Sequence, residues 1–551
     1  MSALPAYAVV AAFLFVMLIV GLYSRRFVKT AEDFHRGGGQ VPWWAAGLSI
    51  YMGAFSAFAF VSFGSVVFTD GGFGVLLGYG LMFAYVVTGL IFAKRWHRAG
   101  LTTPVAYLEN RFGPGTRQLV AAAMLVINAI SSALRLYAFA LMMNGLLGVP
   151  VLPTIVVAGL FMAIIALTGG LWGIVLADSV QFVVLLAGLV PLVILSLVQI
   201  GDAEAVGRLL TTDLFVFDRG DKDWSWLFTW WALTIVTGNF SFPIIQRLSS
   251  VPTENDARKA MFLAAALLVP TPILALIPVV ACFQLLPATP PELAFATMAT
   301  NVLPIGLLGL MAGSMIAATV SELESAFNID SGIVARDIYQ RRINPAASDQ
   351  LILGLARVAT LASAAVATTL AIALAITGTG IFGFSEAVAS FVIVGLCIPF
   401  LAGVLVRPIS ERGFFISLGA SLTAALILAV NGVGAADARV PIISVGIAAL
   451  LVAALIAPAR GEEAMRIATF FERLREPRPN PKGASPQIDR QTLGLVGFAI
   501  LLLGLIPLSL PTLTGTRGLP AFVEYAIAAT LILVGASFSF IARRPASKEG
   551  L

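Results

Sequence analysis

The stretch "SIYMGAFSAFAF", residues 49–60, interrupts an apolar segment that is otherwise long enough to cross a membrane. Gly53 and Ser56 fall near the middle of that segment, where lipid offers the backbone no hydrogen-bonding partner. A membrane helix can break at such a depth only where protein or water lines the broken backbone. Because Gly and Pro are also common in ordinary membrane helices, this stretch alone leaves a break and a continuous helix equally open.

A second interruption occurs in "TIVTGNFSFPIIQR", residues 234–247, which contains Gly238, Asn239 and Pro243. The two interrupted segments lie five spans apart when the apolar segments are counted along the chain. An odd offset turns the second half of the molecule upside down, and paired broken helices mark the central binding site of inverted-repeat transporters. The pattern therefore predicts two inverted halves, spans two to six and spans seven to eleven.

The composition excludes the soluble globular classes. The chain has 551 residues, of which 59% are hydrophobic and 11% are charged, and its mean hydropathy is +0.95. A hydrocarbon core of ~30 Å needs roughly 20 apolar residues per helix, and by this measure the sequence predicts about fifteen spans. We therefore expect an all-α polytopic membrane protein.

Apolar segments and the charged segments between them divide the chain into parts. We expect an N-terminal transmembrane helix in residues 1–24, a first repeat in 43–200, an external loop in 201–224, a second repeat in 225–407, peripheral transmembrane helices in 412–459, a cytoplasmic loop in 460–490 and C-terminal transmembrane helices in 491–551. The cytoplasmic loop begins with helical periodicity and ends as a Pro-rich linker.

Basic residues are distributed unevenly between the two sets of loops. Loops after odd-numbered spans hold most of the Lys and Arg, Arg247 among them; the opposite loops hold only Arg208, Arg219, Lys222, Arg439 and Arg517. Because cytoplasmic loops are enriched in Lys and Arg, we expect the N-terminus outside and the C-terminus in the cytoplasm of a plasma membrane, such as a bacterial inner membrane. The net charge of +5 then reflects topology, so we expect lipid and a small solute as partners, and no nucleic acid. The oligomeric state stays open.

Five motifs follow one another along the chain. They are "SRRFVKTAEDFHRGGGQVPWW", "TTPVAYLENRFG", "TGGLWGIVLADSVQF", "PIIQRLSSVPTENDARKA" and "GLLGLMAGSMIAATVSELESAFNIDSGIVARDIYQRR". Together they resemble the sodium:solute symporter family, relatives of the sodium–glucose and sodium–proline symporters, over about three quarters of the chain. The resemblance implies a leucine-transporter-type inverted-repeat core of ten helices, with one extra N-terminal and about four extra C-terminal spans. It also implies that the solute binds midway, between the two broken helices.

The resemblance further implies a sodium ion between the first broken helix and the inner half of the eighth core helix. The implied ligands are the backbone carbonyls of Met52 and Phe55 and the positions Ala318, Ser321 and Glu322, with the acidic side chain of Asp178 just behind the ion. Glu322 departs from the family pattern, which usually has a second Ser or Thr at this position.

Two carboxylates, Glu322 and Glu324, occur in "TVSELESAFN", residues 319–328. On a helix these side chains point about 200° apart, so they cannot both face the ion. We assign Glu322 to the ion site and Glu324 to the cytoplasm. Beside Asp178, Glu322 would share a proton in the empty site, which makes the proton the alternative coupling ion. In the other alternative, Glu322 rotates away and forms a gate with a cytoplasmic Arg.

Arg135 lies deep within an apolar segment, where a cation is costly and functional by default. Asn128, Ser131 and Ser132 recur at helical spacing with it and could form a polar stripe. The guanidinium fork matches a carboxylate, so the predicted solute is small, polar and carboxylate-bearing. The alternatives are an Arg with a structural partner and small residues that only allow close helix packing. The candidate solute site consists of Gly53, Ser56, Asn128, Ser132, Arg135 and Asn239.

These residues favour a secondary active transporter that moves the solute inward with a sodium ion, or with a proton as the alternative. A transporter-like membrane sensor that acts through a separate signalling partner is the other candidate. We do not expect an enzyme, because the only two histidines, His35 and His97, lie in cytoplasmic loops and form no zinc pair. Glu386, at the outer end of span eleven, is interpreted as a solvated gate residue.

Overall fold

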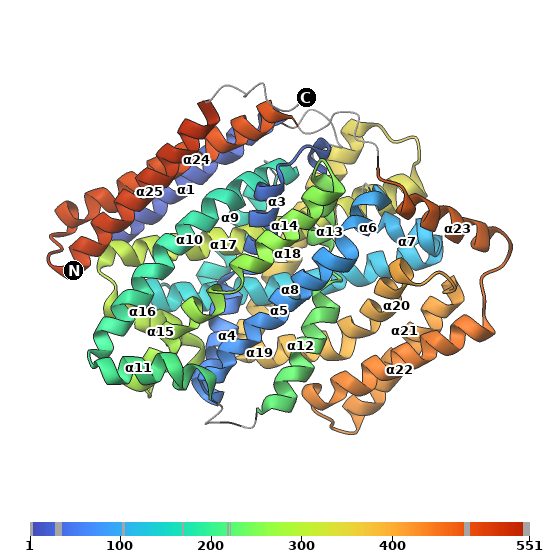
Figure 1. Cartoon of the computed structure of the whole chain (residues 1–551), viewed down its shortest axis with the longest axis horizontal. Helices are drawn as coiled ribbons and strands as arrows, with labels where there is room; N and C mark the ends of the chain where they lie inside the picture. Colours follow the sequence, from blue (N-terminus) through green and yellow to red (C-terminus); the bar gives the residue numbers. More distant parts are fainter. Residues whose placement is uncertain are drawn as a thin grey trace.

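The structure is a computed structural model that describes residues 4–27, 36–101, 105–167, 170–216, 220, 222–478 and 485–543. Within these ranges every regular element is a helix (Figure 1). His35 and residues 479–484 of the predicted cytoplasmic loop lie outside the described residues. The all-α fold class predicted from the sequence is confirmed.

The helices can be grouped by the predicted parts of the chain. The N-terminal part is α1 (Leu4–Ser24). The first predicted repeat contains α3 (Trp43–Met52), α4 (Ala57–Asp70), α5 (Tyr79–Val87), α6 (Ala93–Ala99), α7 (Ala106–Arg111), α8 (Pro114–Leu147), α9 (Val151–Ala166) and α10 (Gly170–Ile200), followed by α11 (Ala203–Thr211) in the predicted external loop. The second contains α12 (Trp224–Gly238), α13 (Phe242–Ser250), α14 (Glu254–Leu267), α15 (Thr271–Leu285), α16 (Ala294–Val302), α17 (Ile305–Gly332), α18 (Asp349–Thr377), α19 (Ile381–Val388) and α20 (Val394–Leu405). The remaining helices are α21 (Glu411–Val430), α22 (Ala435–Ile456), α23 (Gly461–Arg475), α24 (Pro486–Thr514) and α25 (Leu519–Arg543).

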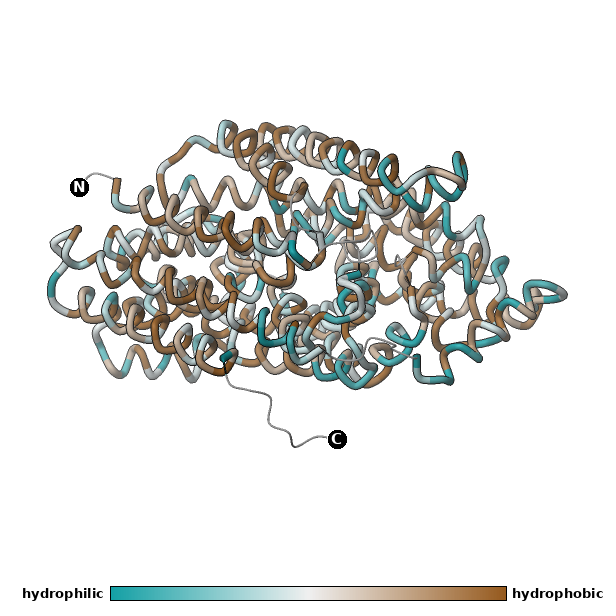
Figure 2. Tube along the Cα trace, turned by 90° about the horizontal axis from the view of Figure 1, so that it is seen from above, coloured by the Kyte–Doolittle hydropathy of each residue, from teal (hydrophilic) through white to brown (hydrophobic). Residues whose placement is uncertain are grey.

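Twelve helical segments of the described chain are long and apolar enough to cross a membrane, or thirteen if the bent pair α3 and α4 counts as one span. Large apolar side chains face outward, as at Leu455 (82% exposed) and Val430 (78% exposed). Apolar residues also run along the lengths of the helices (Figure 2). Such a surface suits lipid, because water would leave these patches prone to association. The predicted count of about fifteen spans stays a prediction.

The first predicted break is present between α3 and α4. Helix α3 ends at Met52, α4 begins at Ala57, and the two axes differ by 50°. Ser56 has an extended backbone (φ −140°, ψ 176°) that cannot continue a helix. The start of α4 is held by α17, because the Ala57 N–H donates to Thr319 Oγ1 at 3.2 Å. A protein group therefore satisfies the broken backbone, as a break at this depth requires.

The second predicted break is present between α12 and α13. Helix α12 ends at Gly238 and α13 begins at Phe242, with Pro243 in its first turn. The Asn239 side chain holds the broken end in place: it donates to the Ile235 carbonyl at 2.8 Å and accepts a hydrogen bond from Thr88 Oγ1 at 2.7 Å. Both interruptions in the sequence are thus real breaks in helices.

The extra helices lie at two opposite edges of the core. Helix α1 packs along α17 and α10, and the hairpin of α24 and α25 lies beside it, whereas α21 and α22 occupy the far edge (Figure 1). Gly309 permits the close approach of α17 to α1, since a Cβ there would lie 2.7 Å from the Ala6 carbonyl oxygen. This contact fixes α17 against its neighbours.

The predicted helical half of the cytoplasmic loop is α23, and it packs on the core. Its buried face consists of Ile467, Phe470 and Leu474. Arg98 of α6 donates to the last carbonyls of α23, those of Leu474 (3.0 Å) and Arg475 (2.9 Å). A basic side chain at a helix C-terminus satisfies carbonyls that the helix itself leaves unpaired.

Candidate functional site

Four helices meet at the carboxylate of Asp178. This residue lies on α10 and is fully buried. Its two oxygens accept hydrogen bonds from the hydroxyls of Ser49 on α3 and Ser321 on α17. Arg247 on α13 lies 3.4 Å away, measured from Nη2 to Oδ2. The two broken helices are therefore connected to α10 and α17 through one buried carboxylate.

Arg247 is a site residue that the sequence interpretation placed wrongly among the loop cations. Its side chain is 2% exposed, and it donates to Ser49 Oγ (2.6 Å), Ser325 Oγ (2.9 Å) and the Pro243 carbonyl (3.2 Å). The sequence feature that could have indicated a buried Arg247 is its position four residues after Pro243, within the first turns of α13. Its contacts with Ser49, Ser325 and Asp178 hold the side chain inside the protein.

The implied sodium ligands lie around the first break and on α17. Met52, Phe55, Ala318 and Ser321 are all buried, and the break is joined to this part of α17 by the bond between Ala57 and Thr319. Because Ser321 gives its hydroxyl hydrogen to Asp178, its oxygen lone pairs are free to accept a cation. Backbone carbonyls and a hydroxyl are hard oxygen ligands, which fit an alkali or alkaline-earth cation.

Glu322 points away from this cluster. Its Oε2 forms an ion pair with Arg135 Nε on α8 at 2.8 Å, whereas the hydrogen bonds to Asp178 come from Ser49, Ser321 and Arg247. The expectation that Glu322 stands beside Asp178 is thus not met in this structure. The second alternative, a pair with an Arg, is the arrangement found, but the partner is Arg135 inside the long helix α8 and not an Arg from a loop.

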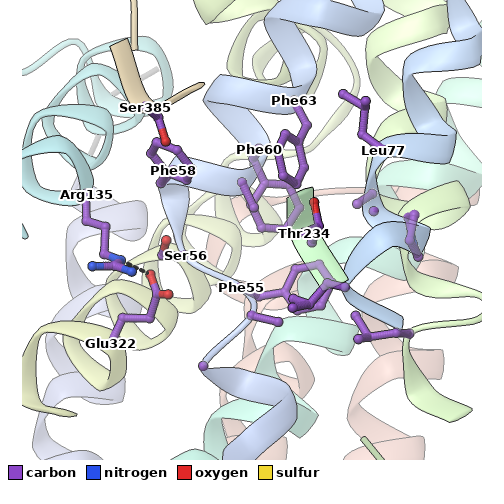
Figure 3. A pocket seen from close by; sticks show the side chains of 18 of the residues that line it. Phe55, Ser56, Phe58, Phe60, Phe63, Leu77, Arg135, Thr234, Glu322 and Ser385 are labelled. Carbon is purple, nitrogen blue, oxygen red and sulfur yellow. Dashed lines mark ion pairs between the residues drawn. The ribbon is translucent and has the colours of Figure 1, made fainter. Parts of the chain in front are cut away.

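A cavity of about 230 Å³, which we name the aromatic cavity, opens beside the first break. Its apolar wall includes Phe55, Phe58, Phe60, Phe63 and Trp230. Its charged groups lie at one end, where the Arg135–Glu322 pair is next to Ser56, whereas the hydroxyls of Thr234 and Ser385 lie elsewhere on the wall (Figure 3).

The candidate solute residues divide into two groups. Gly53, Ser56 and Arg135 line the aromatic cavity. Asn128 instead donates to Asp330 Oδ1 at 2.7 Å and lines a second cavity of about 210 Å³, which we name the Arg247 cavity.

Two further candidates lie away from both cavities. Ser132 is 1% exposed and lines neither, whereas Ser131 lines both. Asn239 holds the second break in place and also lines neither. Asn128, Ser131 and Arg135 of the predicted stripe on α8 line the Arg247 cavity, whereas Ser132 does not. Helical spacing alone could not decide between the two adjacent serines.

Two carboxylates expected to be solvated are largely removed from water, Glu324 by burial and Glu386 by an ion pair. Glu324 is 6% exposed and lines an apolar cavity between α1, α9, α10 and α17, so its assignment to the cytoplasm was wrong. Glu386 pairs with Arg439, whose side chain is 0% exposed. Arg439 was counted as an external loop residue, but it lies over the rings of Trp226 and Trp230. In each case a buried partner or a neighbouring helix removed the side chain from water.

Comparison with known proteins identifies the family. The model of the sodium:solute symporter family matches residues 34–420. The chain belongs to this family. It is 25% identical to the sodium/sialic acid symporter SiaT of Proteus mirabilis over 361 residues, 61% of this chain and 71% of the relative. It is also 25% identical to the sodium/glucose cotransporter of Vibrio parahaemolyticus over 461 residues, 76% of this chain and 84% of the relative.

The fold of this symporter agrees with a solved structure. A substrate-bound, outward-open Na⁺-coupled sialic acid symporter is similar with a TM-score of 0.73 at 21% identity, over 83% of this chain and 98% of that one. The predicted leucine-transporter-type fold and the family are thereby confirmed. Family membership makes the chain a sodium-coupled membrane transporter of a small solute.

Proposed function

We propose that this symporter carries a small carboxylate-bearing solute inward with sodium, and that Arg135 binds the carboxylate. The observation that carries the proposal is a mid-membrane guanidinium on the wall of a cavity at a broken helix. Arg offers a planar fork of donors that matches a carboxylate. The start of α4, which is the positive end of its helix dipole, adds favourable potential for the same anion. The solute of one relative, sialic acid, is itself an acid.

Sodium binds, in this proposal, between the carbonyls of Met52, Phe55 and Ala318 and the hydroxyl of Ser321, with Asp178 behind it. Asp178 acts through Ser321: it accepts the hydroxyl hydrogen and so directs the lone pairs toward the ion. Ion and solute would then share the same break between α3 and α4, which gives a physical route for coupling.

Uptake into proteoliposomes tests this function. The panel consists of a sialic acid, a short monocarboxylate, a neutral amino acid and glucose, each offered with and without an inward sodium gradient. We expect sodium-driven accumulation of at least one carboxylate-bearing member and none of glucose. Absence of sodium-driven accumulation for the whole panel refutes the coupling, and accumulation of glucose alone refutes the carboxylate.

Arg135→Lys tests the assignment of the carboxylate to Arg135. Lys keeps the charge but loses the fork, so the affinity for the accumulated solute should fall about tenfold or more while expression is maintained. Arg208→Lys is the matched control, because the Arg208 side chain on α11 is 62% exposed and pairs with Glu204 four residues earlier. Unchanged solute affinity in Arg135→Lys would leave Arg135 with a structural role.

A further inference from the structure

The Arg135–Glu322 pair separates two cavities. Arg135, Glu322, Gly53 and Ser131 line both the aromatic cavity and the Arg247 cavity. The pair spans the gap between α8 and α17 directly beside the break that ends α3. The ion pair therefore forms the partition between the two cavities, and a solute that passes from one to the other contacts it.

The two cavities differ in character on either side of the pair. The aromatic cavity has phenyl and indole rings along its wall and few polar groups away from the pair. The Arg247 cavity also has apolar residues in its wall, such as Ile50 and Phe240, and adds the polar and charged groups of Asn128, Ser241 and Arg247. A ligand seated in the aromatic cavity is thus met by an apolar wall around its body and by charge at one end only.

A lone carboxylate would be a poor ligand for this arrangement. If it takes the Nε side of Arg135, it parts the guanidinium from Glu322, which then remains as an unpaired carboxylate on a side chain that is only 11% exposed. If it takes only the Nη side, it stands beside the Glu322 charge. Removing one partner of a buried pair is strongly unfavourable, and the ligand's own negative charge beside Glu322 adds repulsion. A ligand that also has a cationic group avoids both penalties. Its carboxylate pairs with Arg135 and its cationic group pairs with Glu322, so two ion pairs replace one.

We propose that Glu322 is a subsite for a cationic group, and that the solute is a zwitterion with a compact apolar or aromatic body. Its carboxylate binds Arg135, its ammonium binds Glu322, and its body occupies the aromatic cavity. Because the solute takes over both halves of the partition, its binding separates the α8 and α17 sides of the pair. This inference rests on the proposed function and adds the chemical class of the solute to it.

Three probes of matched size test the subsite: L-phenylalanine, 3-phenylpropionate, which lacks the amine, and phenethylamine, which lacks the carboxylate. Affinities are measured with purified protein in sodium by ligand-dependent thermal shift. In the native chain phenylalanine should bind roughly tenfold or more tightly than either partial analogue. In Glu322→Gln this preference for phenylalanine over 3-phenylpropionate should disappear.

Glu324→Gln is the matched control, because Glu324 is two residues away on the same helix yet lines the cavity beside α1. It should keep the native preference. The inference is overturned if 3-phenylpropionate binds the native chain as tightly as phenylalanine, if no probe binds, or if the preference survives Glu322→Gln. The native comparison decides even if the Glu322 variant does not fold. If the inference fails in this way, the proposed sodium-driven uptake of a carboxylate is still tested independently, since the uptake panel includes carboxylates without an amine.

Discussion

Replacing Asp178 by Asn should weaken sodium binding through charge and through orientation. The carboxylate accepts the hydroxyl hydrogen of Ser321, an implied sodium ligand. Asn has nearly the same shape, so the packing of α10 is retained, but it removes the negative charge. It also leaves Arg247, 2% exposed, without the carboxylate that neutralises it.

The size of the effect follows from the geometry. A sodium ion on Ser321 Oγ would stand roughly 5 Å from Asp178, one hydrogen bond plus one metal–oxygen distance. At an effective dielectric constant of about 20, two unit charges at this separation attract by about 3 kcal/mol. We therefore expect the sodium affinity to fall roughly 100-fold. Arg247, at roughly 8 Å from the ion, repels it by about 2 kcal/mol. The double variant Asp178→Asn with Arg247→Gln should therefore bind sodium roughly 30-fold more tightly than Asp178→Asn alone.

The assay is a sodium titration of the thermal unfolding midpoint, with choline chloride keeping the ionic strength constant. Ligand binding to the native state raises this midpoint with the logarithm of the sodium concentration. Asp330→Asn is the matched control, because Asp330 is a buried carboxylate that binds Asn128 instead of Ser321. If the unfolding midpoint of Asp178→Asn depends on sodium concentration as it does in the native chain, the reasoning is refuted. If the double variant binds sodium no more tightly than Asp178→Asn alone, the expected repulsion between Arg247 and the ion is refuted.

Two further predictions concern orientation and acid sensitivity. With the C-terminus in the cytoplasm, Ser485→Cys should be protected from impermeant thiol reagents added outside intact cells, and ready external labelling would reverse the orientation. Burial alone would raise the pKa of the Glu109 carboxyl, but hydrogen bonds from Arg341 and Arg117 outweigh it and hold the pKa below its ordinary value of 4.5. Because the folded-state pKa is lowered, the contribution of Glu109 to stability is present above pH 4.5 and is lost as the pH falls through the lowered value. Unfolding midpoints from pH 7 downward should therefore fall more steeply in the native chain than in Glu109→Gln, and parallel curves would contradict this.

The breaks could be predicted from the sequence because they depend on local chemistry. Gly53 and Ser56 weaken one helix, and Gly238 and Pro243 weaken the other. Lipid cannot satisfy a freed backbone, so each interruption required a partner inside the protein, which the structure supplies through Thr319 and Asn239. The family motifs supplied the rest of the core architecture.

The buried ion pairs could not be predicted in the same way. Arg247 and Arg439 look like loop cations in a linear count, but each pairs with a carboxylate from a segment far away in the chain. A long side chain near the end of a span can reach either water or an interior partner. Which one it reaches depends on tertiary neighbours that the local sequence does not contain.

The roles of the carboxylates on α17 depend on one rotation that the sequence leaves open. Helical geometry states only that Glu322 and Glu324 point in different directions. The rotation is fixed by contacts elsewhere on the helix: Gly309 packs against α1, and Thr319 binds the start of α4. With Ser321 thereby turned to Asp178, the next residue lies about 100° further round, where α8 presents Arg135. A carboxylate at position 322 consequently pairs with Arg135 and lines both cavities beside α8.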